Sequence, residues 1–248
     1  MSLMVCSLLS CKESDNRLSL GEQPVYQVMK SIDPMFVDGK MDEPIWAKAE
    51  VRSLDNFYRV EMPSDKQPSS IRMVWDDENL YVFYQIQDKY LTARETKPDG
   101  QPYNDDCVEF FIIPAPDSLD SHIGFEVNLF KATNDFIYFN NYYQKRNYVF
   151  KAFDPDHEVE VTYEGTINDN SDLDQGWTLE LAIPFSTFRD LPGTLKNIEG
   201  SKWAIQAVRQ DRNDAEGDRR SSATLFPVYD IKKSVHQANR FGLMKFIE

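Results

Sequence analysis

The stretch Ile71-Arg-Met-Val-Trp-Asp-Asp-Glu-Asn-Leu-Tyr-Val-Phe-Tyr-Gln-Ile-Gln87 decides the fold class of this chain. Two runs rich in β-branched and aromatic residues flank the polar turn 76–79, which is the pattern of a β-hairpin. Successive side chains of a strand point to opposite faces, so alternate residues of the second run share one face. We therefore expect one core face, formed by Leu80, Val82, Tyr84 and Ile86.

The same period of two recurs along the rest of the chain. Short apolar runs separated by turn residues occur at 106–113, 125–129, 159–163, 177–183, 203–208 and 240–247. Aromatic residues make up 13% of the chain, which also favours strands over helices. We predict an all-β fold, a two-sheet antiparallel β-sandwich of the immunoglobulin-like or jelly-roll type, spanning residues 22–248 as one domain.

One short N-terminal helix is predicted after Asp42. The Asp42 carboxylate suits an N-cap, Glu43 complements the helix dipole, and Pro44 is tolerated in a first helical turn. Trp46 is then expected to point into the core.

The charge balance restricts the classes of partner. The chain has 27 Lys and Arg against 41 Asp and Glu, a formal net charge of −14. Proteins that bind nucleic acid through its backbone use cationic side chains to neutralise phosphates, so we expect no nucleic-acid partner. A composition of 41% hydrophobic and 27% charged residues is typical of an ordinary globular protein.

The N-terminal run ends in Leu8-Leu9-Ser10-Cys11, which is similar to a bacterial lipobox. Cys11 would then carry the lipid, and we interpret residues 1–21 as a lipoprotein signal remnant and linker. The segment 12–15 resembles the signal that sends some Bacteroidetes lipoproteins to the cell surface. We expect a cell-envelope lipoprotein of the outer membrane, surface-exposed or periplasmic, attached to the membrane by its lipid anchor only. The alternative is an ordinary frayed N-terminus.

Polar side chains interrupt several predicted strands, each with apolar neighbours on both sides. They are Glu109, Glu126, Asn128, Glu180 and Gln206. If these strands are neighbours, the polar positions line one sheet face and form a hydrogen-bonding patch. Sugars are recognised by such groups together with an aromatic ring, because hydroxyls need donors and acceptors while the C–H face of a sugar stacks on a ring. A half-solvated sheet face is the alternative interpretation.

Six motifs in order, at 37–46, 74–82, 105–111, 125–128, 182–185 and 240–243, resemble those of carbohydrate-binding module family 9-like domains. Among them are Asp105-Asp106-Cys107-Val108-Glu109 and Phe125-Glu126-Val127-Asn128. The resemblance covers nearly everything from about residue 30 to 248. It implies a β-sandwich, found alone or attached to xylanases. The studied sugar-binding members hold the reducing end of xylan or cellulose chains between two tryptophans, and bound calcium supports their structure.

The resemblance assigns candidate sugar-binding residues position by position. Glu109 and Asn128 match a glutamate and an asparagine that hydrogen-bond the sugar, and Tyr103 falls where the first tryptophan stands. Glu126 occupies the place of a sugar-contacting arginine. Leu225 or Phe226 stands near the place of the second tryptophan.

The aromatic stretch 136–150 offers further rings for stacking, of which Tyr142, Tyr143 and Tyr148 are candidates. An ordinary edge strand would also explain these rings.

The calcium that the resemblance implies has candidate ligands in two acidic loops. Asp172 and Asp174 lie in the first loop, and Asp214 and Asp218 lie in the second. Solvated turns explain the same residues, because neither loop has the spacing of an EF-hand.

The function predicted from the sequence is non-catalytic binding of a plant-type polysaccharide such as xylan or glucan, or its oligosaccharides, for glycan capture. A structural or protein-interaction sandwich in an envelope complex is the alternative, with other envelope proteins of a glycan-utilisation system as partners. A further alternative is an endo-xylanase-like glycoside hydrolase, which needs two carboxylates at a set separation across a cleft; abundant acids do not by themselves supply that geometry. Haem binding through Met and His, found in distantly related sandwich domains, has no positional signature here, and we expect no organic cofactor.

Overall fold

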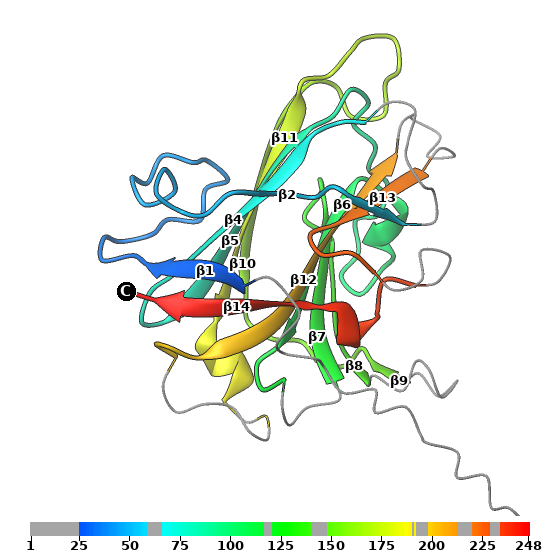
Figure 1. Cartoon of the computed structure of the whole chain (residues 1–248). Helices are drawn as coiled ribbons and strands as arrows, with labels where there is room; N and C mark the ends of the chain where they lie inside the picture. The colour runs from blue at the N-terminus through cyan, green and yellow to red at the C-terminus, as the bar shows by residue number, and fades with distance from the viewer. Residues whose placement is uncertain are drawn as a thin grey trace, which may run out of the picture.

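The computed structural model describes residues 25–58, 66–116, 121–139, 148–189, 191, 198–212, 220–228 and 234–248. Within these residues the chain is built from strands and short 3₁₀ helices (Figure 1). The first strands are β1 (Val25–Lys30), β2 (Arg52–Ser53), β3 (Asn56–Tyr58), β4 (Ser69–Trp75), β5 (Asn79–Gln87), β6 (Cys107–Ile113) and β7 (Ser121–Asn128). They are followed by β8 (Thr133–Phe139), β9 (Tyr148–Phe150), β10 (Glu158–Glu164), β11 (Gly176–Pro184), β12 (Lys202–Arg212), β13 (Arg220–Thr224) and β14 (Gly242–Ile247). The 3₁₀ helices are η1 (Pro102–Asn104), η3 (Phe185–Phe188) and η4 (Ala238–Arg240).

The strands form one continuous ladder that curls into two layers. Their order is β10-β11-β5-β4-β1-β14-β12-β6-β7-β8-β9, with β2, β3 and β13 attached beside this path. Strands β10, β11, β5 and β4 make the first layer, and β12, β6, β7, β8 and β9 make the second. Strands β1 and β14 join the layers and lie side by side in Figure 1.

The predicted all-β sandwich is confirmed, with one difference in strand direction. Strand β1 pairs parallel with β14 through Val25–Met29 and parallel with β4 through Met29–Lys30, whereas the hairpin-forming pairs of both layers are antiparallel. A parallel pairing links segments far apart in the sequence, so local hairpin signals do not reveal it.

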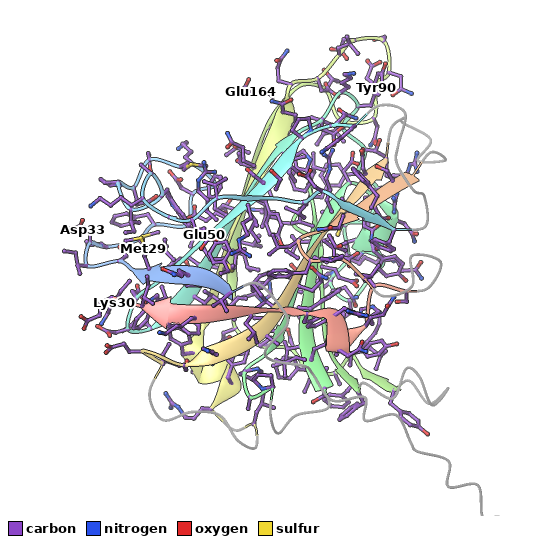
Figure 2. The ribbon with its side chains drawn as sticks, in the orientation of Figure 1. Met29, Lys30, Asp33, Glu50, Tyr90 and Glu164 are labelled. Carbon is purple, nitrogen blue, oxygen red and sulfur yellow. The ribbon has the colours of Figure 1, made fainter. Side chains whose placement is uncertain are left out.

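The principal core lies between the layers, and side chains fill this space in Figure 2. The predicted core face of the hairpin is confirmed, since Leu80, Val82, Tyr84 and Ile86 are all buried in it. The second layer contributes alternate residues of its strands, including Val108, Phe110 and Ile112 of β6 and Ile123, Phe125 and Val127 of β7. Alternation therefore turns the intervening residues of β6 and β7 to the outer face of the second layer.

A second cluster packs on the outer face of the first layer. Trp46 is completely buried there, 5.4 Å from the ring of Phe83, as expected for a core residue. The predicted helix around it is not supported, because residues 44–48 form turns. Glu43 explains this difference: its carboxylate accepts hydrogen bonds from Phe36 N–H and from the Trp46 indole, which fix the segment through side-chain contacts.

Figure 2 places Lys30 and Asp33 at one side of the molecule and Tyr90 with Glu164 at the far end of β10. Among the residues that the structure describes, no helix has the length and apolar character needed to cross a membrane. The predicted signal segment 1–21 lies outside the described residues.

Candidate functional site

A cluster of polar side chains occupies the outer face of the second layer. Glu109 of β6 lies directly opposite Glu126 of β7, and Glu126 lies opposite Asn134 of β8. Directly opposed residues of neighbouring strands project to the same face, with Cβ atoms about 5 Å apart. The structure thus brings together the two glutamates that the sequence placed on separate strands.

Amide groups position the two carboxylates. The Nδ2 of Asn134 donates to Glu126 Oε2 at 2.6 Å, and the Nε2 of Gln210 donates to Glu109 Oε1 at 2.7 Å. Gln210 belongs to the end of β12, and its Oε1 accepts a 2.6 Å bond from Ser222 of β13. Both carboxylates are almost completely covered, with 2% of Glu109 and 5% of Glu126 exposed.

Burial and mutual repulsion govern the electrostatics of this pair. The pKa of Glu126 is raised well above its ordinary value, first by burial and then by the charge of Glu109. The same two carboxylates contribute to a raised pKa of Tyr103, whose main cause is also burial. The 3₁₀ helix η1, which carries Tyr103, packs against β6 and β7.

Tyr103 sits in the 3₁₀ helix η1 and is partly exposed. The guanidinium of Arg212, at the end of β12, donates to the carbonyl oxygens of Tyr103 and Asn104. Arg212 N–H donates to Asp106 Oδ1 at 2.6 Å, which ties β12 to the start of β6. The aromatic ring is thus carried by a turn that Arg212 of β12 fixes, and this turn packs against β6 and β7.

Asn128 is completely buried, and the described contacts use its side chain inside the protein. Its Nδ2 donates to Glu95 O and to Asp105 Oδ2, both at 2.8 Å, and its Oδ1 accepts from Phe130 N–H and Ala132 N–H. These bonds shape the loops on either side of η1. A direct contact from Asn128 to a sugar stays a prediction.

The remaining sequence predictions fall in other places. Gln206 shares the outer face of the second layer but is bonded to the backbone of Phe226. Glu180 lies on β11 in the first layer, where it accepts from Asp38 N–H and Gly39 N–H. Leu225 and Phe226 are buried in the principal core. Tyr142 and Tyr143 lie outside the described residues, and Tyr148 is exposed on the edge strand β9.

Sequence reasoning missed Asn134, Gln210 and Arg212. The run Arg209-Gln-Asp-Arg212 is polar and was not included in the strand predicted at 203–208, although β12 continues through Arg212. The alternation of side chains along the strand, extended from Gln206 through Val208, would have placed Gln210 on the same face. Asn134 follows a short turn after β7, which marks it as a hairpin partner of Glu126.

The four predicted calcium ligands lie in different environments. Asp174 is buried, and its carboxylate accepts hydrogen bonds from Leu91 N–H and Thr166 N–H at 2.7 Å each. It therefore links the backbone segments around these two residues. Asp172 is exposed and accepts from the Thr166 hydroxyl. Asp214 and Asp218 lie outside the described residues. Calcium at these residues stays a prediction.

A different acidic cluster, not foreseen from the sequence, gathers Asp88, Asp106 and Asp211, whose carboxylate oxygens lie within 4.8 Å of one another. All three are buried, and burial raises the pKa of Asp88 to about 6. The donor set is one that a hard cation prefers. The guanidinium of Arg209, however, is 3.1 Å from Asp88 and 3.5 Å from Asp211. The cluster therefore already contains a cation, and an open calcium site does not fit it.

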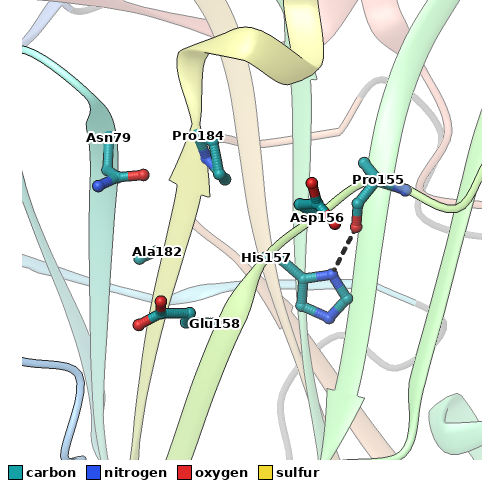
Figure 3. Close-up of a pocket in the computed structure, with 7 residues that line it drawn as sticks. All are labelled: Asn79, Pro155, Asp156, His157, Glu158, Ala182 and Pro184. Carbon is teal, nitrogen blue, oxygen red and sulfur yellow. Dashed lines mark hydrogen bonds between the residues drawn. The ribbon is translucent and has the colours of Figure 1, made fainter.

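A pocket of about 410 Å³ opens elsewhere, at the edge formed by β5, β10 and β11 (Figure 3). His157 Nδ1 donates to the Pro155 carbonyl in its wall. The pocket shares no described residue with the polar cluster of Glu109 and Glu126. It is lined by Asn79, Pro155, Asp156, His157, Glu158, Ala182 and Pro184.

Two curated enzymes contain a segment similar to this chain. The chain is 25% identical over 165 residues to exoglucanase XynX of Acetivibrio thermocellus, covering 64% of this chain. It is 26% identical over 183 residues to endo-1,4-beta-xylanase A of Thermoanaerobacterium saccharolyticum, covering 71% of this chain. The matched segment spans only 12% and 13% of those relatives.

Solved structures share the fold. A protein from Bacteroides uniformis aligns with a TM-score of 0.70 at 18% identity, over 90% of this chain and 99% of that one. A carbohydrate-binding module of family 9 from Caldicellulosiruptor kristjanssonii, in complex with cellotriose, aligns with a TM-score of 0.61 at 19% identity, over 90% and 94%. Its complex with glucose gives 0.59 at 17%, over 89% and 95%. The model of the carbohydrate family 9 binding domain-like family matches residues 37–248, and the chain therefore belongs to that family.

Proposed function

We propose that this chain binds carbohydrate without catalysis, on the outer face of the second layer. The observation that carries the proposal is that Glu109 and Glu126 lie opposite each other on β6 and β7, and that η1, which carries the partly exposed Tyr103, packs against these two strands. A ring supplies the surface on which a sugar stacks, and the carboxylates accept hydrogen bonds from its hydroxyls. Family membership supports the same function.

The glycan class proposed is a plant-type polysaccharide such as xylan or glucan, or its oligosaccharides. The support comes from relatives, since matching segments occur in a xylanase and an exoglucanase and a structurally similar module holds cellotriose. These are properties of those proteins, and they set the choice of ligands to test on this one.

Binding rather than hydrolysis follows from how the carboxylates are held. A glycosidase places its two acids on either side of the scissile bond with room for sugar or water between them. Glu109 and Glu126 are covered, and each accepts a hydrogen bond from a neighbouring amide. This arrangement suits a site that holds polar ligand atoms in place.

A protein-interaction sandwich is the second candidate, and one surface favours it. Strand β9 ends the sheet order, and its residues Tyr148, Val149 and Phe150 are between 46% and 64% exposed. An exposed apolar edge strand can pair with a strand of another protein. This edge is remote in sheet order from β12, which positions Tyr103.

We further propose that a lipid on Cys11 anchors the domain to the outer membrane, where envelope proteins of a glycan-utilisation system are its neighbours. The lipobox-like sequence before Cys11 supports this placement. Membrane fractionation of cells expressing the full chain tests it. The wild type should sediment with membranes and Cys11→Ser should be released, whereas equal sedimentation of both would contradict the anchor.

A glycan array with residues 22–248 tests the binding function. Binding to xylan or glucan fragments is expected, and Glu109→Gln should weaken it because a carboxylate acceptor is lost. Glu158→Gln, at the separate pocket, serves as the matched control and should bind like the wild type. A blank array for the wild type, with the fold verified by circular dichroism, would overturn the proposal and favour the interaction surface at β9.

A further inference from the structure

The two strands at the end of the second layer carry a group of exposed aromatic rings, which we call the ring row: Phe139, Tyr148 and Phe150. Phe139 of β8 lies directly opposite Tyr148 of β9, and Phe150 is the next residue of β9 on the same face. The exposed fractions are 44% for Phe139, 64% for Tyr148 and 50% for Phe150. A ligand in solution can therefore reach all three rings.

The ring row continues the inner face of the second layer past the principal core. Phe150 lies opposite Ile137, which packs partly buried against that core. Directly opposed side chains of neighbouring strands are about 5 Å apart, and alternate residues of one strand are about 7 Å apart. Because the C–H faces of sugars stack on aromatic rings, neighbouring units of one oligosaccharide can contact more than one ring of the row.

Charge distinguishes this edge of the sheet from the rest of the chain. The residues between Asp135 and Asp154 include three cationic side chains and no acid, in a chain whose net charge is −14. One of the three cations, Lys151, follows Phe150 directly and is exposed. The strand at the opposite end of the sheet order, β10, has three glutamates among its seven residues. An anionic ligand is thus repelled at β10 and attracted beside the ring row.

Rings and a neighbouring ammonium group suit a carbohydrate that carries acid groups. The rings supply the stacking surface, and the flexible stem of Lys151 lets its ammonium pair with a carboxylate. The carboxylates of Glu109 and Glu126 would repel such a ligand, so it needs a surface of its own. We propose that the ring row and Lys151 bind a uronic-acid-bearing polysaccharide, as a second glycan surface separate from the site at Tyr103. The inference rests on the proposed carbohydrate-binding function.

Titration calorimetry at low ionic strength with two pairs of ligands tests the inference. One pair is the xylan trimer with and without a glucuronic acid substituent, and the other is the galacturonic acid trimer and its methyl ester. Each pair compares an acidic ligand with a neutral one. In at least one pair we expect the acidic ligand to bind about two- to fivefold more tightly, as for an exposed ion pair. This ratio should shrink as ionic strength rises.

Variants of the ring row and of its cation provide the second readout. The double variant Tyr148→Ala with Phe150→Ala should weaken binding of the acidic ligand at least about fivefold, by analogy with other aromatic stacking platforms. Lys151→Gln should bring the ratio of acidic to neutral affinity towards one. The matched controls are Tyr163→Ala, at an exposed tyrosine of β10, and Lys40→Gln, at an exposed lysine paired with Asp38. Both controls should behave like the wild type.

Three results would overturn the inference and leave the site at Tyr103 standing. The first is equal affinity within both ligand pairs. The second is wild-type affinity for the acidic ligand in the double variant, with its fold verified by circular dichroism. The third is binding of an oligoglutamate peptide without binding of either uronate, which would assign the ring row to an acidic protein. Binding of no carbohydrate, together with a blank glycan array, would instead overturn the proposed function itself.

Discussion

The guanidinium of Arg212 donates hydrogen bonds to the carbonyl oxygens of Tyr103 and Asn104, so the last residue of β12 fixes the turn that carries the partly exposed ring of the candidate site. Arg212 is 1% exposed, and its own N–H is bonded to Asp106. The stacking surface is therefore part of the strand framework. The position of the Tyr103 ring therefore depends on Arg212, which is itself buried.

Replacing Arg212 with Met tests this dependence. The substitution removes the side-chain donor to the partly buried carbonyl groups of Tyr103 and Asn104, so we expect a loss of about 1–3 kcal/mol in the free energy of unfolding. Urea denaturation measures the loss. Ligand affinity measured well below the melting temperature should also fall, and Arg212→Lys should restore part of both. A folded Arg212→Met variant with wild-type affinity would contradict the positioning role.

Glu180 predicts a pH dependence of stability. Burial raises the pKa of Glu180 from its ordinary value of 4.5 to about 7, against the lowering effect of its bonds from Gly39 and Asp38. Because the folded state holds this proton more tightly than the unfolded state, the contribution to stability is complete below about pH 4.5 and is lost as pH rises through about 7. Glu180→Gln keeps an acceptor for both N–H groups and cannot ionise.

The stability of Glu180→Gln relative to wild type should therefore rise between about pH 4.5 and 7, by an amount of the order of a few kcal/mol, and level off above. Urea denaturation at a series of pH values gives this difference. Comparing the two proteins cancels the titration of Asp88 and Asp135, whose pKa values are raised to about 6 and about 7. A difference that does not vary with pH would disprove the assignment to Glu180.

Arg209 takes the place of a metal ion in the acidic cluster of Asp88, Asp106 and Asp211. Arg209→Met leaves buried Asp88 and Asp211 without the cation that pairs with them, beside the third buried carboxylate Asp106, which should destabilise the protein by about 3–5 kcal/mol. Calcium should raise the melting temperature of this variant, because an ion bound only by the folded state stabilises it. The wild type should gain less from calcium than the variant, because Arg209 already pairs with Asp88 and Asp211. Equal increases in melting temperature in the two proteins would place the bound calcium outside this cluster.

Asp174 and Asp172 form a matched pair for separating loop fixation from metal binding. Asp174 is buried and holds the backbone N–H groups of Leu91 and Thr166, so Asp174→Ala should lower the unfolding free energy by about 1–3 kcal/mol. Asp172 is exposed, and Asp172→Ala should change it by less than about 0.5 kcal/mol. Thermal melts with and without calcium check both. Equal losses, present only with calcium, would point to shared metal ligation.

Local pattern was sufficient to predict the hairpins of the fold. The turn between β4 and β5 was recognisable because Asp76 is an acceptor for the N–H groups of Glu78 and Asn79, a property of aspartate in turns. Strand β1 was not predicted, because its partners β4 and β14 lie far away in sequence. The predicted helix was wrong because Glu43 makes its contacts with Phe36 and Trp46, and sequence spacing does not show such contacts.

The candidate site was predictable where alternation alone places a side chain. Glu109 and Glu126 could be assigned to strands, but their direct opposition depends on the register between β6 and β7. Gln210 and Arg212 were hidden because a strand end of polar residues looks like a loop. Asn128 matched a family position, yet only the three-dimensional contacts show that its side chain serves the loops around η1.

The central claim is that Tyr103 and the two carboxylates beside it bind a sugar chain. It is tested by calorimetric titration of the wild type and of Tyr103→Ala with cellotriose and a xylan trimer. We expect measurable binding of at least one trimer and a loss of about 1–3 kcal/mol of binding free energy in Tyr103→Ala, by analogy with other aromatic stacking platforms. A Tyr103→Ala variant that is folded and binds its ligand as tightly as the wild type would contradict it.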